Sequence, residues 1–137
     1  MTARIPPYMK GAHSLVLFVV TIGGLLENEA SSLTSGKDPL SGYLLDRIGS
    51  FAVESLAERL ENRLRRDYSL KKNSVSSRFS PGYCDWRVEE QFKLNNLLDF
   101  SKAGVNLTEG CMMVPKISIS AIVAVAGEGV FKDFVSV

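Results

Sequence analysis

The stretch LLDRIGSFAVESLAERLENRLR, residues 44–65, decides the fold. Its apolar side chains recur every three or four residues, which is typical of an amphipathic helix with one face on a core. Asp38 and Pro39 precede it and form a strong helix start, an N-cap acid followed by proline in the first turn. Gly49 and Ser50 fall inside it, where a helix can kink or split. The predicted apolar face consists of Leu45, Ile48, Ala52, Leu56, Leu60 and Leu64.

Three charged residues of this helix bear on function. Glu61 and Arg65 have the order and spacing of a favourable i, i+4 pair, which we expect on the exposed side. Glu54 lies near the apolar face without belonging to it. Most glutamates on helices are solvated, so Glu54 gives no functional signal by itself.

An apolar run precedes the helix. LVLFVVTIGG, residues 15–24, is rich in Val, Ile and Phe and apolar on both faces, which predicts a central strand at residues 15–22. The run also resembles the core of a signal peptide, because Arg4 and Lys10 come before it. No small-x-small cleavage site follows directly, and the run is too short to span a bilayer. We favour a buried strand, with an exported protein trimmed near Ala30 as the alternative.

A second strand is predicted at residues 117–125, where the side chains follow a two-residue period and Gly127 and Gly129 come after the run. Between the first strand and the long helix, Leu26, Ala30 and Leu33 have helical spacing, with a glycine C-cap at residue 36. Strand, helices and strand predict an α+β fold, in which a long amphipathic helix and further helices pack on a mostly antiparallel, twisted sheet. The length fits one domain, residues 1–137, with residues 1–14 as an arm.

The middle of the chain has weaker signals. Residues 69–77 are polar and without period, which predicts a surface loop. Asp85 is expected to cap a following helix, and Gly104 to close that helical region. Thr108 and Glu109 predict a turn bonded into the sheet. The apolar side chains expected inside are Val88, Phe92, Leu97, Leu98, Met112 and Met113.

Composition excludes several functions. Sixteen basic and fifteen acidic residues leave a net charge of +1, which gives no general attraction to nucleic acid or anionic lipid. Cys84 and Cys111 are too few for a disulfide framework or a four-sulfur zinc site, and they fit a reducing, cytoplasmic compartment. His13 is the only histidine, so no multi-histidine metal site is expected. Four arginines do cluster in the long helix, and we interpret them as a solvated helix end, with a docking patch for an acidic partner as the alternative: Arg59, Arg63, Arg65 and Arg66.

The clearest chemistry lies in RFSPGY, residues 78–83. Arg78 offers a planar fork of donors that matches a carboxylate. Pro81 stiffens the turn, and Gly82 lets a ligand approach the backbone. Tyr83 could stack on adenine or face a sulfonium cation. Taken alone, a Pro-Gly turn with flanking Arg and Tyr is also a common structural arrangement.

Three blocks appear in a characteristic order: RFSPGYCDWRVEEQ from residue 78, LNNLL from residue 94, and GVNLTEGCMMVPKISISAIVAVA from residue 104. Together they resemble the activation domain of cobalamin-dependent methionine synthase, whose pattern is RxxPGYP, an acid-rich helix start, and an LTES block running into SxSG. The stretch 44–65 resembles the long helix of that family, with Glu54 in its acidic position. The likeness runs from about Phe18 to about Val125.

The resemblance implies a domain that binds S-adenosylmethionine and swings over a cobalamin domain to rescue inactive cob(II)alamin. A reductant supplies one electron, and the sulfonium methyl group moves to cobalt. Carried over residue by residue, Arg78 would hold the methionine carboxylate, and the backbone of Ser80 and Gly82 would contact the ligand. Tyr83 would lie along the ligand, and Glu54 would face it from the helix. No catalytic residue or metal ligand is expected on the chain itself.

The resemblance also implies partners. We expect an accessory component, inactive alone, that docks on the cobalamin-binding domain of methionine synthase or on another corrinoid protein. An electron donor such as a flavodoxin or ferredoxin is expected, and a homodimer is a further expectation. Nucleic acid and membrane are not expected partners.

Departures from the family pattern, including the lack of an evident acid in the N-terminal arm, leave an alternative. Ala121 stands where the family has glycine, and Cys84 where it has proline. The loop before Arg78 has Lys72 and Asn73 but no acid, and the chain stops before the family's ligand-facing tyrosine. The alternative is a non-catalytic interaction module for a corrinoid protein that has lost S-adenosylmethionine binding.

Overall fold

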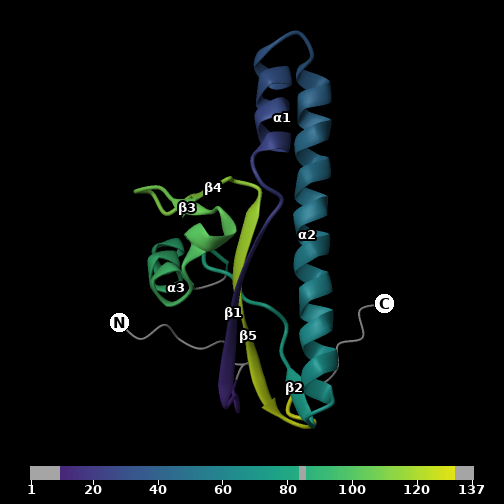
Figure 1. The fold of residues 1–137 in the computed structure, drawn as a ribbon, viewed down its shortest axis with the longest axis vertical. Coiled ribbons are helices and arrows are strands. Elements are labelled where there is room, and N and C mark those ends of the chain that lie inside the picture. The colour runs from purple at the N-terminus through teal and green to yellow at the C-terminus, as the bar shows by residue number, and fades with distance from the viewer. Residues whose placement is uncertain (1–9, 84–85, 132–137) are drawn as a thin grey trace.

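A computed structural model describes residues 10–83 and 86–131 and has the predicted α+β architecture (Figure 1). A three-stranded antiparallel sheet packs on a long helix, and shorter helices and a small hairpin cover the sheet's other face. The elements are β1 (Ser14–Thr21), α1 (Leu25–Ser35), α2 (Pro39–Ser69), β2 (Asn73–Val75), η2 (Val88–Glu90), α3 (Gln91–Leu97), η3 (Phe100–Ala103), β3 (Asn106–Leu107), β4 (Met113–Val114) and β5 (Ser118–Gly127).

The sheet order is β1-β5-β2, so β5 is the central strand and β1 lies at an edge. The prediction that the first strand is central was therefore wrong. The side chains of β5 are small and apolar enough for the strand to be buried on both faces. Its residues Ala121, Ala124 and Ala126 are fully inaccessible to solvent. β1 is less covered, because Leu15 is 49% exposed. An apolar run alone does not show which strand is enclosed by neighbours on both edges.

The two faces of β5 belong to different cores. The odd-numbered residues Ala121, Val123 and Val125 pack with Phe18 and with Ala57 of α2. The even-numbered ones turn to the opposite face, where Ala124 and Ala126 pack with Phe79 and Phe131. A strand presents alternate residues to opposite sides, so β5 separates the α2 core from the layer that contains the RFSPGY segment.

α1 and α2 form a hairpin that projects beyond the sheet (Figure 1). The Oδ1 atom of Asp38 accepts a bond of 3.1 Å from Ser41 N–H, and Pro39 opens the helix, as predicted. α2 runs unbroken through Gly49 and Ser50, so these residues do not split it. A Cβ atom on Gly49 would lie 2.7 Å from Leu26 Cδ2, which shows that this glycine is a packing contact.

The buried face of α2 is rotated away from the predicted one. Ile48 is 59% exposed and Leu56 41% exposed, although both were expected inside. Leu60 and Leu64 do pack against the core as predicted, but in the first part of the helix small residues let α1 and the sheet approach closely and the larger apolar side chains are turned outward. The buried residues of α2 are Gly42, Gly49, Val53, Ala57 and Glu61.

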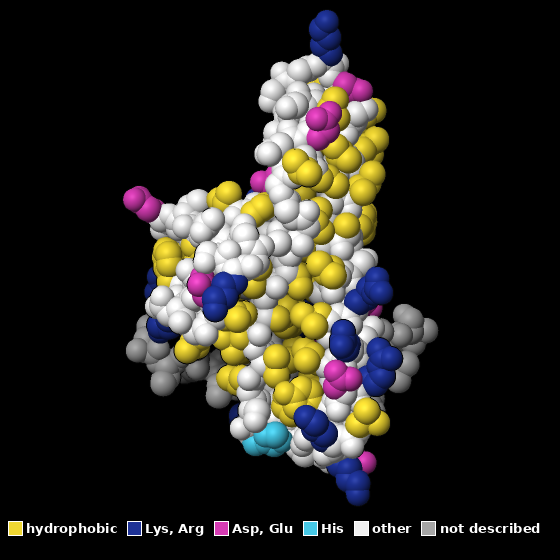
Figure 2. All heavy atoms as spheres, in the orientation of Figure 1, with side chains coloured by type: hydrophobic (Ala, Val, Ile, Leu, Met, Phe, Trp, Pro, Cys, Tyr) yellow, Lys and Arg dark blue, Asp and Glu magenta, His cyan; other side chains and the backbone are white. Residues whose placement is uncertain are grey.

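Five large apolar side chains of α2 remain more than half exposed, and we call them the hairpin face. Figure 2 shows hydrophobic side chains over the projecting part of the hairpin. Isolated exposed apolar residues are ordinary, but a contiguous group on one helix marks a surface for interaction. The hairpin face consists of Leu40, Tyr43, Leu44, Ile48 and Phe51.

The prediction of a surface loop at residues 69–77 was wrong. This segment contains β2, which pairs with the far end of β5. Ser74 is 8% and Ser76 3% exposed; the Ser74 hydroxyl donates to Gly127 O at 2.7 Å, and the Ser76 hydroxyl accepts from Ala124 N–H at 2.9 Å. The polar side chains concealed the strand, because their partners are distant in the chain.

Three apolar residues of the middle segment are exposed against prediction: Phe92 at 40%, Leu97 at 77% and Met112 at 60%. α3 is short and begins at Gln91 after a 3₁₀ turn, so Gln91 and Leu94 take the inner positions instead. Thr108 does form the predicted turn, accepting a 3.1 Å bond from Met112 N–H. Asp85 and its predicted cap lie outside the described residues.

Candidate functional site: a charged cavity beside the RFSPGY turn

A cavity of about 430 Å³ opens where α2, the RFSPGY segment and β5 meet. Glu54, Arg78, Ser80 and Tyr83 line it, so four of the five predicted site residues come together at one place. Gly82 does not line it. The volume lies within the roughly 300–1,000 Å³ of small-molecule pockets.

Phe79 positions this segment. Its backbone forms two bonds of 2.9 Å with Ile122, N–H to carbonyl in each direction, which continues the sheet just past the end of β2. Its ring is buried and stacks on Trp86 at 5.1 Å between centroids. Since neighbouring residues in extended chain project to opposite sides, Arg78 and Ser80 face away from the ring of Phe79, toward the cavity.

The turn explains why glycine stands at position 82. Gly82 has a φ of +91°, which favours glycine over any residue with a Cβ atom. Its N–H donates to Trp86 O at 2.8 Å, and Tyr83 N–H donates to Ser80 O at 3.3 Å. Gly82 therefore shapes the bend that presents Ser80 and Tyr83 to the cavity.

The central feature of the site is a chain of charges on Arg78. Its Nη2 atom forms an ion pair with Glu54, and its Nε lies 3.3 Å from Glu61 Oε1. Glu61 also bonds to Arg65 Nη2 at 3.2 Å. The Glu54 side chain is 54% exposed, whereas that of Glu61 is 11% exposed. Glu61 thus holds the guanidinium from the buried side, and Glu54 holds it from the exposed side, at the cavity mouth.

The third nitrogen of the guanidinium differs from the other two. Nη1 of Arg78 is buried and makes no hydrogen bond within the described chain. A buried donor without an acceptor is costly, so such an atom marks a position where an acceptor from outside can bind. The most direct such acceptor is a ligand carboxylate, because the guanidinium edge is planar and charged.

Sequence reasoning missed Glu61, which was predicted on the exposed side of α2. Its pairing with Arg65 is confirmed, but its predicted exposure is wrong, because Glu61 is buried. The available signal was its spacing: Glu61 follows Glu54 by seven residues, two helical turns, which places both carboxylates on one side of the helix.

A buried polar pair closes the floor. Ser120 Oγ donates to Gln91 Oε1 at 2.7 Å, and Gln91 Nε2 donates to Cys111 O at 3.0 Å. Gln91, Ser118 and Ser120 all line the cavity. Past Phe79, no strand within residues 10–83 and 86–131 pairs with this edge of β5, so its backbone groups border the cavity.

Two negative findings concern the part of the chain that the structure describes. No group of three or more His, Cys, Asp or Glu residues there could hold a metal ion. No helix there combines the length and hydrophobicity needed to cross a bilayer. Cys111 is buried, and Cys84 lies outside the described residues.

Comparison with known families gives a match to the vitamin B12-dependent methionine synthase activation domain, over residues 5–131. The chain belongs to this activation-domain family. Among curated proteins, none matches the chain. Membership gives the chain a role in cobalamin reactivation and implies a cobalamin-binding partner.

For an activation domain, the departure at Ala121 has a structural explanation. Ala121 is fully buried and packs in the α2 core, on the opposite face of β5 from Ser118 and Ser120. Its methyl group therefore does not enter the cavity, which Ala121 does not line. Asn73 lies in the segment before Arg78 that has no acidic residue. Its side chain is likewise engaged elsewhere, because its Oδ1 lies 3.2 Å from His13 Nε2.

Proposed function

We propose that the chain binds S-adenosylmethionine in the cavity and presents it to a separate corrinoid protein, chiefly the cobalamin-binding domain of methionine synthase. The observation that supports this most is the ion pair of Arg78 and Glu54 at the cavity, together with the buried Nη1 atom of Arg78, which has no hydrogen-bond partner among the described residues. Family membership supplies the cobalamin context. A cytoplasmic location belongs to the same proposal.

The two charges suit a zwitterionic ligand. In the free protein, Arg78 and Glu54 neutralise each other. The methionine end of the ligand carries a carboxylate and an ammonium group, so each half of the ion pair can exchange its partner for a ligand group of opposite charge. The carboxylate would take Nη1 and Nη2 of Arg78, and the ammonium or sulfonium would take Glu54. This exchange keeps every charge paired, which a singly charged ligand could not do.

The remaining lining residues would orient the rest of the ligand. Tyr83 is 68% exposed at the cavity, where its ring can lie against adenine or the sulfonium. Ser120 and Gln91 offer hydroxyl and amide groups at the floor. Because Glu61 holds Arg78 in place, the carboxylate end of the ligand would bind at a fixed position in the cavity.

Bound there, S-adenosylmethionine would supply the methyl cation that reductive methylation moves to the partner's cobalt, as the carbon–sulfur bond breaks and S-adenosylhomocysteine leaves. A separate one-electron donor, such as a flavodoxin or ferredoxin, would reduce cob(II)alamin first. The chain contributes binding and orientation, so it should be inactive without its partner.

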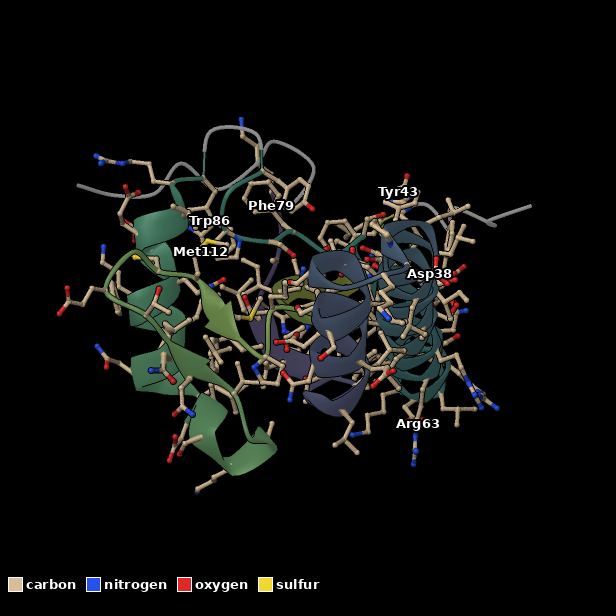
Figure 3. All side chains as sticks on the ribbon, turned by 90° about the horizontal axis from the view of Figure 1, so that it is seen from above. Asp38, Tyr43, Arg63, Phe79, Trp86 and Met112 are labelled. Atoms are coloured by element: carbon tan, nitrogen blue, oxygen red, sulfur yellow. The ribbon has the colours of Figure 1, made fainter. Side chains whose placement is uncertain are left out.

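Titration calorimetry with S-adenosylmethionine tests the proposal. Arg78→Lys keeps the charge but loses the fork, and we expect it to weaken binding about 10- to 100-fold, the equivalent of one charged hydrogen bond. Arg63→Ala, on the opposite side of the molecule, should bind like the wild type (Figure 3). No saturable binding by the wild type, or equal binding by Arg78→Lys, would contradict the proposal.

One observation favours the second candidate, an interaction module without the ligand. Two carboxylates, Glu54 and Glu61, already engage Arg78, so its charge is fully neutralised before any ligand arrives. Association with a corrinoid domain in the absence of any S-adenosylmethionine binding would decide for this candidate. Glu54→Gln separates the two candidate functions further. It removes one carboxylate that competes for Arg78, so binding of a simple carboxylate should become stronger if the arginine is accessible.

A further inference from the structure

The hairpin face of α2 runs directly into the cavity. Phe51 precedes Glu54 by three residues, and Tyr43 precedes Phe51 by eight, so the three lie along the same side of the helix. Tyr43 is 60% and Phe51 65% exposed. Figure 3 shows Tyr43 pointing to the same side of the molecule as Phe79 and Trp86, whereas Arg63 points to the opposite side.

The other rim of the cavity is aromatic as well. Tyr83 lines the cavity and is 68% exposed. Tyr and Phe are enriched in the energetically dominant parts of protein interfaces, and an apolar patch beside a cavity is costly to leave in water. The mouth is therefore flanked by surfaces suited to contact with a protein.

Charged side chains also lie at and beside the mouth of the cavity. Glu54 of α2 lines the cavity and forms an ion pair with Arg78. Arg47 lies beside the hairpin face, with its guanidinium carbon 5.5 Å from the centre of the Phe51 ring, a cation–π contact that keeps a positive charge at this surface. The surface beside the mouth therefore presents the rings of Tyr43 and Phe51 together with the positive charge of Arg47.

We infer that the hairpin face is the docking surface for the corrinoid protein, and that this protein covers the cavity mouth and the projecting part of α2 together. The inference rests on the proposed function. A methyl group can pass from the cavity only through its mouth, so the acceptor protein must sit on the mouth. The hairpin face is the apolar surface that continues from it along α2, and a partner there buries Tyr43, Leu44 and Phe51.

The test measures two affinities for each variant. Binding to the cobalamin-loaded cobalamin-binding domain of methionine synthase is followed by biolayer interferometry, and S-adenosylmethionine binding by calorimetry. Leu44→Glu places a charge in the face far from the cavity. Phe51→Ala removes a ring without placing a charge beside Glu54. Leu70→Glu is the matched control, because Leu70 is 83% exposed at the far end of α2.

We expect Leu44→Glu and Phe51→Ala to weaken association with the corrinoid domain about tenfold or more, as the loss of an interface anchor does. Their affinity for S-adenosylmethionine should stay within about twofold of the wild type, since neither side chain lines the cavity. Leu70→Glu should change neither affinity.

The outcomes separate this inference from the proposed function. Wild-type association that is insensitive to both hairpin-face variants overturns the inference, and so does absence of association. A chain that is dimeric by light scattering and becomes monomeric on Phe51→Ala also overturns it, because the face would then bind a second copy. Loss of association in the variants without any S-adenosylmethionine binding by the wild type supports the docking surface and contradicts the ligand.

Discussion

Arg78 and Glu54 form an ion pair at the cavity although 24 residues separate them in the chain. The long helix supplies the carboxylate, and the single bridge between Phe79 and Ile122 fixes the arginine beside it. The pair satisfies both charges while the cavity is free, and it is also the contact that a zwitterionic ligand would have to open. Glu61, in contrast, is almost enclosed and can keep its hold on the guanidinium throughout.

Glu61→Gln is therefore expected to affect the ligand's amino-acid end selectively. The amide can keep one hydrogen bond but not both charged ones, so Arg78 loses its fixed orientation. S-adenosylmethionine binding should weaken about tenfold, whereas 5′-methylthioadenosine, which lacks the amino-acid end, should bind as before. Calorimetry with both ligands measures this. Equal loss for both ligands would indicate a general structural effect.

Asp67→Asn provides the control for Glu61. Asp67 pairs with Arg63 at 3.9 Å between side chains that are 59% and 76% exposed. Exposed pairs of this kind contribute little, about 0–1 kcal/mol, so thermal stability and ligand binding should both be unchanged.

Close helix packing predicts a large effect of adding a methyl group at Gly42. A Cβ atom there would lie 2.3 Å from Thr34 Oγ1 and 2.7 Å from Ala30 O, and the backbone oxygen cannot move aside cheaply. Gly42→Ala should lower the free energy of unfolding by about 1–3 kcal/mol, although alanine is the better helix former. Chemical denaturation gives the value. Gly127→Ala is the control, because a Cβ atom there meets nothing within 4 Å.

The short-range features of the fold could be predicted from the sequence. The Asp38 cap, the Gly36 C-cap and the end of β5 at Gly127 depend on neighbouring residues, and all are present. The RFSPGY motif likewise pointed to a place where four of the predicted residues meet.

The features that failed depend on distant partners. The rotation of α2 is set by Gly42, Gly49 and Ala57, which contribute little hydrophobicity to a periodic pattern but allow close approach. β2 could not be found because Ser74 bonds to a residue 53 positions away. Glu61 could not be assigned because its burial depends on the segment that brings Arg78 to it. In each case the sequence shows the residue, but its structural role depends on a neighbour that is distant in the chain.

Ser74 gives a direct test of that nonlocal contact. Its hydroxyl donates to Gly127 O at 2.7 Å and accepts from Phe131 N–H at 3.1 Å. Ser74→Ala would leave a buried N–H without an acceptor, which should cost about 1–3 kcal/mol and speed hydrogen exchange at the Phe131 amide. Ser77→Ala, at an exposed neighbouring position, should change neither quantity. Unchanged exchange at Phe131 in Ser74→Ala would show that this bond contributes nothing.

The start of α2 should make stability depend on acid. Hydrogen bonds from the Ser41 hydroxyl and then from the Ser41 backbone N–H hold the pKa of Asp38 below its ordinary value. A carboxyl group whose pKa is lower in the folded state stabilises the fold fully above its unfolded pKa, about 3.9 for aspartate, and loses that contribution as the pH falls through the folded value. Asn also caps helices but does not titrate.

Asp38→Asn should accordingly melt below the wild type near neutral pH, because the charged bond and the interaction with the helix dipole are gone. The difference in melting temperature should shrink toward zero as the pH is lowered through the acidic range, since the wild-type carboxyl becomes neutral there. Thermal unfolding of both proteins across this range measures the difference, in which the titration of all other carboxyl groups cancels. A difference that stays constant with pH would mean that the Asp38 charge does not contribute to the cap.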